Sequence, residues 1–267
     1  MMKYKIIILS MMALLSIGCQ VEYHPYDTRI RGARGINARN IARIEEACAG
    51  RRTLRFAVLS DTQRWYDETR DAVAALNGRD DLDFVIHTGD MADFGMRSEF
   101  ERQRDILEQL RVPYVVLIGN HDCLATGERI FREIFGAVDF AFTAGSVRVV
   151  CLNTNSLEFD RSRAVPDIDF IERQLAEYPA EAERTVVAMH AQPYSDQFDN
   201  GVAPYFQSRL REFPGLEFCV HGHGHRFLVE DIFDDGVNYY MCDNIQKRSY
   251  LVFTINEMGY DCERVEF

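Results

Sequence analysis

The chain has 267 residues, of which 47% are hydrophobic, and this is enough for one large or two small globular domains with a buried core. Its formal net charge is −12, but residues 1–55 carry a net charge of +6 and residues 56–267 a net charge of −18. The main body therefore lacks the basic surface that nonspecific nucleic-acid binding requires, and we expect no specific nucleic-acid binding.

The N-terminus has the pattern of an export signal. Residues 1–5 contain two lysines, and the apolar run from Ile6 to Gly18 is too short to span a bilayer. The run ends in Leu-Ser-Ile-Gly-Cys, which is similar to a bacterial lipoprotein cleavage box. We therefore expect a signal peptide over residues 1–18, a lipid on Cys19 and an exported, membrane-anchored protein in the periplasm or at the cell surface. Cleavage without lipidation is the alternative.

A linker is expected to connect this signal to one folded domain. Residues 19–37 are rich in arginine and glycine, and they are either a solvated, lipidated tether or a segment that contacts an anionic surface. Residues 38–267 are expected to form the domain. Its first helix is predicted over residues 38–49 from apolar residues at helical spacing, and Gly50 ends it.

From residue 54 onward, predicted strands and helices alternate. Apolar runs bounded by turn residues indicate the strands, and amphipathic runs with capping signals indicate the helices. The strands are expected at 54–59, 84–87, 113–118, 147–152, 185–189 and 216–220. The helices are expected at 67–77, 98–110, 128–135, 166–178 and 203–213. Ser98 and Glu101 are predicted to form a capping box.

The last part of the chain has a different pattern. Residues 239–242, 250–255 and 260–267 are predicted to be antiparallel strands that belong to a second sheet. The earlier alternation favours a mixed or parallel sheet covered by helices, so the fold class is α/β.

Polar side chains follow several of the predicted strands directly. In open α/β sheets, ligands and chemistry collect at the carboxyl ends of the strands. The residues at these ends are Asp61, Asp90, Asn120, His190, His223 and His225. Carboxylate, amide and imidazole groups in this combination suit two borderline divalent ions such as Mn, Fe or Zn.

Five short motifs occur in order around these residues. They are Ser60-Asp61-Thr62-Gln63, Gly89-Asp90-Met91-Ala92-Asp93, Gly119-Asn120-His121-Asp122, Met189-His190 and Gly222-His223-Gly224-His225. The series resembles the calcineurin-like metallophosphoesterases. The resemblance implies a four-layer α/β/β/α sandwich and hydrolysis of a small phosphomonoester or phosphodiester by a metal-activated hydroxide.

The resemblance also implies a role for each matched residue. The first ion is expected on Asp61, Asp90 and His225. The second is expected on Asp90, Asn120, His190 and His223, so that Asp90 bridges the two ions. His121 is expected to contact the phosphate and to assist the leaving oxygen. Asp93 matches the family's carboxylate that orients this histidine.

One position departs from the family pattern. Gln63 stands where most members have a metal-binding histidine, and an amide oxygen binds borderline metals more weakly than imidazole does. Gln63 is expected to bind the first ion directly, to bind it through water, or to contact substrate only. This position also favours an alternative function, a non-catalytic metal- or phosphate-binding module on the same fold.

The remaining polar residues are expected to be structural. Asp122 is predicted to brace its loop, and His87 and His221 are predicted to lie in the core. The segment 192–207 follows His190 and either frames the substrate or is a plain surface loop. Besides Cys19 the chain has six cysteines, and their pattern does not define a disulfide framework.

Overall fold

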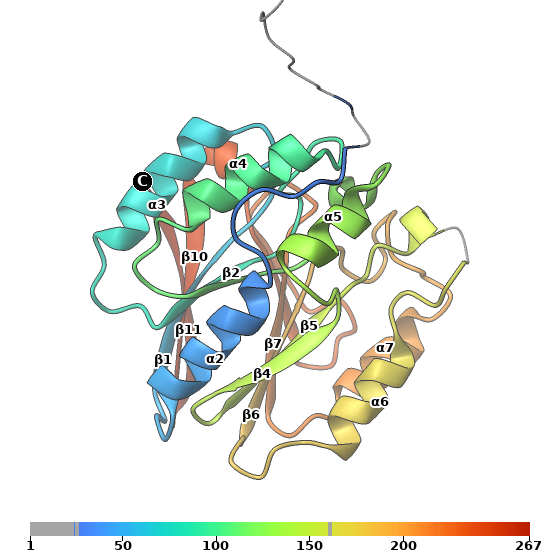
Figure 1. Ribbon diagram of the computed structural model, residues 1–267. Helices are drawn as coiled ribbons and strands as arrows, with labels where there is room; N and C mark the ends of the chain where they lie inside the picture. The colour runs from blue at the N-terminus through green and yellow to red at the C-terminus, as the bar shows by residue number, and fades with distance from the viewer. Residues whose placement is uncertain (1–23, 25–26, 160–161) are drawn as a thin grey trace, which may run out of the picture.

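Two β-sheets face each other in the computed structural model, which describes residues 24, 27–159 and 162–267 (Figure 1). The first sheet has the strand order β11-β10-β1-β2-β3. Strands β1, β2 and β3 run parallel, whereas β10 is antiparallel to both of its neighbours, β1 and β11. The bounds are β1 (Leu54–Leu59), β2 (Phe84–His87), β3 (Tyr114–Val116), β10 (Ser249–Asn256) and β11 (Gly259–Glu266).

The second sheet has the order β4-β5-β6-β7-β9-β8. Strands β5, β6, β7 and β9 are parallel, and the two edge strands are antiparallel to their neighbours. The bounds are β4 (Phe140–Ala144), β5 (Val147–Leu152), β6 (Arg184–Met189), β7 (Leu216–His221), β8 (Leu228–Glu230) and β9 (Asn238–Met241).

Helices cover both outer faces. Figure 1 shows α3 (Tyr66–Asn77) and α4 (Arg97–Leu107) on one side of the sheets, and α6 (Ile168–Ala176) and α7 (Ala203–Leu210) on the other. The helix α5 (Gly127–Ile134) packs with α3 and α4, whereas α2 (Ile36–Cys48) contacts the edge strands β3 and β4. Short 3₁₀ turns occupy His121–Cys123, Ser156–Phe159 and Ile245–Lys247.

The layers follow from strands that are buried on both faces. In β1, Phe56 and Val58 pack between the sheets, whereas Ala57 and Leu59 pack under the helices. Aromatic rings fill the space between the sheets; for example, the rings of Phe218 and Phe253 stack with centroids 4.3 Å apart. Such two-sided burial explains the continuous apolar runs in the sequence. The predicted four-layer α/β/β/α sandwich is confirmed.

The last two tail strands, β10 and β11, pair antiparallel as predicted, but the other pairings of the tail differ from the prediction. The strand β9 is parallel to β7, and β10 and β11 join the first sheet beside β1. The hydrophobic pattern identifies a strand but not its partner, because partner choice depends on contacts across the whole chain. The edge strands β4 and β8 were not predicted.

Part of the expected tether packs on the body. Ile30 is buried, and the guanidinium of Arg104 donates hydrogen bonds to the carbonyls of Arg31 and Ala33. Glu101 accepts the backbone N–H of Arg31 rather than capping α4. The predicted capping box is therefore wrong. Its place is taken by Glu99, whose carboxylate accepts the N–H of Met96 at 3.0 Å.

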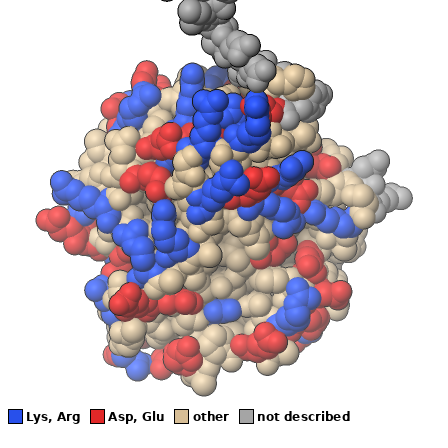
Figure 2. Space-filling view, in the orientation of Figure 1, with Lys and Arg blue, Asp and Glu red and all other residues tan. Residues whose placement is uncertain are grey.

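The face of Figure 2 carries charges of both signs. Among the ion pairs of the structure, arginines of the N-terminal segment and α2 contact carboxylates of the neighbouring helices, as in Arg34–Glu133 and Arg39–Glu108. The positive charge of these two arginines is thus neutralised by neighbouring acids. Residues 1–23, where the signal peptide and lipidation site are predicted, lie outside the described residues. No described helix has the length and apolarity to cross a bilayer.

Candidate metal centre

Residues with unusual backbone angles are concentrated at the site. A positive φ is uncommon for residues other than glycine, and such strain gathers at functional sites. Nine such residues occur in the described part of the chain, and five of them are predicted metal ligands. These five are Asp61, Gln63, Asp90, His223 and His225.

Glycines allow the strand ends to approach one another closely. A Cβ atom added at Gly119 would lie 2.1 Å from Oδ1 of Asp90, and one added at Gly222 would lie 1.9 Å from Oγ of Ser60. At Gly89, where φ is +104°, an added Cβ would lie 2.8 Å from Nδ1 of His190. Any side chain at these positions would push the predicted ligands apart, so the motifs need glycine here.

Two carboxylates and one imidazole form the centre of the cluster. One potential ligand atom from each of Asp61, Asp90 and His190 lies within 4.8 Å of the other two, and all three side chains are almost completely buried. The ion pairs of the two acids are with histidines: Asp61 with His225 and Asp90 with His190. Buried carboxylates without a Lys or Arg partner are costly unless a cation compensates them, so this cluster fits a divalent ion.

Four further predicted ligands converge around this centre. The side-chain oxygen Oδ1 of Asn120 lies 3.0 Å from Nε2 of His190 and 3.2 Å from Nδ1 of His223. On the other side, Nε2 of His225 lies 3.1 Å from Oδ1 of Asp61. The side-chain amide of Gln63 lies 3.4 Å from Oδ2 of Asp90. All seven residues predicted as metal ligands therefore meet at one edge, between the two sheets.

The acids and histidines of this centre shift one another's pKa values. Burial alone raises the pKa of Asp61, but hydrogen bonding from His225 and the neighbouring imidazoles lower it to about 2. Burial alone lowers the pKa of His190, whereas the charge of Asp90 raises it to about 9. Both shifts show that the buried acids attract positive charge, which is the property that a metal centre needs.

The structure corrects the expectation for Asp93. The ring nitrogen Nδ1 of His121 lies 2.7 Å from the backbone carbonyl of Asp93, not from its carboxylate. The carboxylate is held instead by Nε and Nη2, on one edge of the Arg64 guanidinium, at 2.6 and 2.8 Å. A two-pronged Arg–carboxylate pair is the stronger interaction, so Asp93 orients His121 through its main chain.

The loop that carries Asn120 is braced as predicted. The buried carboxylate of Asp122 accepts the backbone N–H groups of Asp90, Ala92 and Gly119 at 2.8–2.9 Å. His87 and His221 are also buried, and burial lowers their pKa values to about 4 and about 3. Both are therefore neutral core residues, which confirms their predicted structural role.

Some residues at the site had no signal in the sequence. Ser60 donates to Asp61, the carbonyl of Thr88 lies 2.8 Å from Nδ1 of His190, and Asp196 lies 2.7 Å from Nε2 of His223. These contacts join segments up to about a hundred residues apart, so spacing along the chain does not reveal them. Only the position of Asp196 in the segment after His190 indicated a role near the site.

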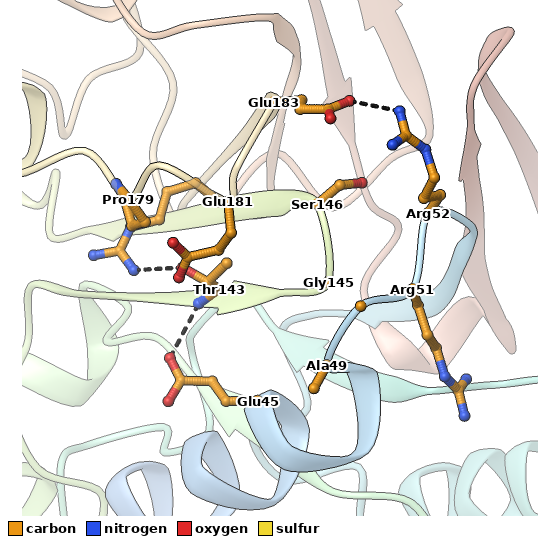
Figure 3. Close-up of a pocket in the computed structure, with 12 residues that line it drawn as sticks. Glu45, Ala49, Arg51, Arg52, Thr143, Gly145, Ser146, Pro179, Glu181 and Glu183 are labelled. Carbon is orange, nitrogen blue, oxygen red and sulfur yellow. Dashed lines mark hydrogen bonds and ion pairs between the residues drawn. The ribbon is translucent and has the colours of Figure 1, made fainter.

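A cavity of about 550 Å³ lies at the opposite ends of the strands (Figure 3). Two of its acidic side chains have partners: Glu183 pairs with Arg52, and Glu45 accepts the backbone N–H of Thr143. Among the described residues, the acidic and imidazole groups that could hold a metal ion converge between the sheets and not in this cavity.

Comparison with known proteins identifies a family and several relatives. A model described as calcineurin-like phosphoesterase matches residues 54–227, the stretch that contains all seven predicted ligands. A probable cyclic nucleotide phosphodiesterase of Rhodopseudomonas palustris is 29% identical over 153 residues, which are 48% of this chain and 54% of that protein. A 3′,5′-cyclic-nucleotide phosphodiesterase of Nostoc is 25% identical and covers 55% of this chain and 58% of its own length.

Solved structures share the fold at low sequence identity. Purple acid phosphatase from yellow lupin seeds aligns with a TM-score of 0.63 and 13% identity over 82% of this chain and 52% of that one. The Plasmodium protein GAP50, described as an anchor in the inner membrane complex, aligns with a TM-score of 0.59 and 13% identity over 81% and 85% of the two chains. At such identities, the likeness establishes the architecture alone.

Proposed function

The chain belongs to the calcineurin-like phosphoesterase family, and from this premise we propose that it hydrolyses a small phosphoester at the cluster between its two sheets. The observation that carries the proposal is the convergence of Asp61, Asp90 and His190 within 4.8 Å, with Asn120, His223 and His225 around them. The chain spans 54–60% of the length of the curated relatives it matches, so their activity enters here only as support for this proposal.

The family uses divalent metals, and we propose two such ions, drawn from Mn, Fe and Zn. Asp61, Asp90, His225 and Gln63 would hold one ion, and Asp90, Asn120, His190 and His223 would hold the other. The ions would supply Lewis acidity that offsets charge on the phosphoryl group and makes the attacking water more acidic.

The chain's own residues would bind and orient the reactants. His121 donates through Nδ1 to the carbonyl of Asp93, which leaves Nε2 to face the substrate. In its protonated form, Nε2 would donate to the leaving ester oxygen and stabilise its developing charge. The Asp122 brace fixes the backbone between Gly119 and His121, so this ring keeps its position relative to Asn120.

A diester substrate is favoured by the relatives, which are named as cyclic nucleotide phosphodiesterases. The test is a purified mature protein, loaded with Mn²⁺ or Zn²⁺ and offered an aryl phosphodiester, an aryl phosphomonoester and a 3′,5′-cyclic nucleotide. We expect turnover on the diesters, and a 10²–10⁴-fold lower kcat for His121→Ala, the range of general acid–base contributions. His24→Ala, at the N-terminal end of the described residues, is the control with unchanged activity. Binding of two ions without turnover on this panel would instead establish the metal-binding module.

We propose in addition that the protein is exported and anchored through a lipid on Cys19. The support is the sequence alone: two lysines, an apolar run and a terminal cysteine in residues 1–19. Metabolic labelling with a radioactive fatty acid in the native host tests this. Label on the wild type and its loss in Cys19→Ser is the expected result, whereas an unlabelled, secreted wild type would indicate cleavage without lipidation.

A further inference from the structure

The segment after β6 reaches the candidate metal centre at Asp196. The side chain of Asn200 accepts the N–H of Tyr194 at 2.8 Å and donates to the carbonyl of Ser195 at 3.0 Å. Farther on, the side-chain amide of Gln197 donates to Glu158 at 3.0 Å. These contacts lie on both sides of Asp196 and hold its main chain beside His223.

The carboxylate of Asp196 contacts a predicted metal ligand. Its Oδ1 atom lies 2.7 Å from Nε2 of His223, although 78% of the Asp196 side chain is exposed. The other ring nitrogen of His223, Nδ1, lies 3.2 Å from Oδ1 of Asn120. The ring therefore spans the distance between the surface carboxylate and the centre.

His190 offers a direct comparison, because its ring is arranged the other way round. Its Nδ1 atom lies 2.8 Å from the carbonyl of Thr88, and its Nε2 atom points to Asn120 at 3.0 Å. In a neutral imidazole, the nitrogen that donates a hydrogen bond carries the proton, and the other nitrogen keeps the lone pair. A carbonyl can only accept, so Thr88 holds a proton on Nδ1 of His190 and leaves Nε2 as the nitrogen whose lone pair a metal ion would use. His223 needs the opposite tautomer.

The other contacts of His223 do not select that tautomer. Its backbone N–H donates to Oδ2 of Asp61 at 3.2 Å, and its ring packs edge-to-face on His190 with centroids 5.3 Å apart. These contacts hold the main chain and the plane of the ring, but neither distinguishes Nδ1 from Nε2. Two acceptors compete for the ring proton, Oδ1 of Asn120 at 3.2 Å from Nδ1 and the carboxylate of Asp196 at 2.7 Å from Nε2. The ionised carboxylate makes the shorter, charge-assisted hydrogen bond, so it holds the proton on Nε2.

We propose that Asp196 is a positioning residue that holds the proton of His223 on Nε2 and so turns the Nδ1 lone pair toward Asn120 and the predicted second metal site. The tautomer rests on the hydrogen-bond geometry alone, whereas its consequence for metal affinity rests on the proposed function. Partners of this kind, on the outer nitrogen of a metal-binding histidine, typically change metal affinity 10–100-fold.

The first experiment reads the tautomer without any metal. Long-range ¹H–¹⁵N spectra of the metal-free protein, with His223 assigned by its loss in His223→Gln, report which nitrogen is protonated. We expect the Nε2–H form in the wild type and in Asp199→Asn, and a mixture of tautomers in Asp196→Ala. Asp199 is a suitable control because it is an exposed carboxylate in the same segment and caps only the N–H of Gly201. An unchanged His223 spectrum in Asp196→Ala would overturn the proposal.

The second experiment measures metal affinity by titrating the metal-free protein with Mn²⁺ or Zn²⁺ in a calorimeter. We expect Asp196→Ala to weaken one of two binding events 10–100-fold and Asp196→Asn, which keeps an acceptor oxygen, to weaken it less. Equal affinities in the wild type and Asp196→Ala would contradict the assigned role. A wild type that binds no ion would contradict the proposed function instead, and the tautomer spectra would then decide the role of Asp196.

Discussion

The two sheets contribute different chemistry to the site. Oxygen ligands come from the first sheet, where Asp61, Asp90 and Asn120 follow β1, β2 and β3. Imidazoles come from the second sheet, where His190 follows β6 and the remaining two histidines follow β7. The acids are almost completely buried, whereas the exposed fraction of the histidine side chains rises from 0% at His190 to 21% at His223 and 43% at His225.

This difference shows two ways of holding a ligand. On the oxygen side, main-chain groups fix the acids: the carboxylate of Asp90 accepts the N–H of His121, and Asp122 ties three further N–H groups together. On the imidazole side, single partners such as the carbonyl of Thr88 and the carboxylate of Asp196 hold each ring. We therefore expect damage to the oxygen side to reduce stability and metal binding together, and damage to the outer imidazoles to reduce metal binding alone.

Gly119→Ala tests the oxygen side most severely. The added Cβ would lie 2.1 Å from Oδ1 and 2.2 Å from the backbone nitrogen of Asp90, so both the main chain and the carboxylate of Asp90 must move. We expect a loss of about 4 kcal/mol in the free energy of unfolding, near the upper end for single substitutions. Binding of two ions should be lost with it. Urea denaturation and calorimetric titration measure the two effects.

Gly78→Ala is the matched control for this substitution. Gly78 ends α3 with φ −77°, and a Cβ there would meet only the carbonyl of Ala75 at 3.2 Å and that of Ala74 at 3.8 Å. We expect stability within about 0.5 kcal/mol of the wild type and unchanged metal binding. If Gly119→Ala behaved in the same way, the close approach of β2 and β3 would not be essential to the site.

Asp122→Ala removes the carboxylate that braces the loop and leaves every predicted ligand side chain in place. Three buried N–H groups lose their acceptor, and each unsatisfied group costs about 1–3 kcal/mol, though not additively. We expect a loss of about 3 kcal/mol, measured by urea denaturation. Asp167→Ala is the comparison, because Asp167 caps only the N–H of Phe170 at the start of α6, and its loss should cost about 1 kcal/mol. Equal losses would mean that the three hydrogen bonds of Asp122 together stabilise the fold no more than the single hydrogen bond of Asp167.

The imidazole side should separate stability from affinity. His190→Ala empties a fully buried position and removes the contact with Thr88, so we expect a loss of about 2–3 kcal/mol together with metal binding. His225→Gln removes a half-exposed ring but keeps a donor for the buried carboxylate of Asp61, so it should lower metal affinity while the melting temperature stays within about 2 °C. Thermal unfolding of both metal-free variants, followed by metal titration, makes the comparison. A similar loss of stability in both variants would falsify the idea that a more exposed histidine contributes less to stability.

Most of the layer structure could be predicted from the sequence because the strands are buried on both faces. The apolar runs predicted β1, β2 and β5 with their observed bounds. Pairing could not be predicted in the same way: β9 lies parallel to β7, although the pattern of its residues fits either direction. Capping failed at Glu101 for a similar reason, since a partner 70 residues away, Arg31, claims its carboxylate.

The site shows the same limit at a finer scale. The motifs predicted which residues gather, and the structure brings all seven predicted ligands to one edge. The motifs did not predict which partners hold Asp93 and His223. Arg64 takes the carboxylate of Asp93 away from His121, and Asp196 reaches His223 from an exposed segment. Both partners are side chains outside the motif positions, and their contacts depend on the folded backbone.

A largely buried carboxylate just before β4, Asp139, does not take part in the site, and it gives the smallest expected effect. Asp139 accepts the N–H of Asn153 at 2.8 Å, and burial, assisted by the charge of Asp167, raises the pKa of Asp139 from 3.8 to about 6. The folded state then holds the proton more tightly than the unfolded chain, so stability falls as the pH rises from about 4 to about 6. Asp139→Asn keeps the acceptor oxygen and removes the charge. We expect this variant to match the wild type near pH 4 and to be more stable by about 2 kcal/mol above pH 6, as measured by urea denaturation at both pH values. A difference that does not change with pH would show that Asp139 is not the source of this pH dependence, whereas the expected change would show that a buried acid outside the metal centre destabilises the fold when it ionises.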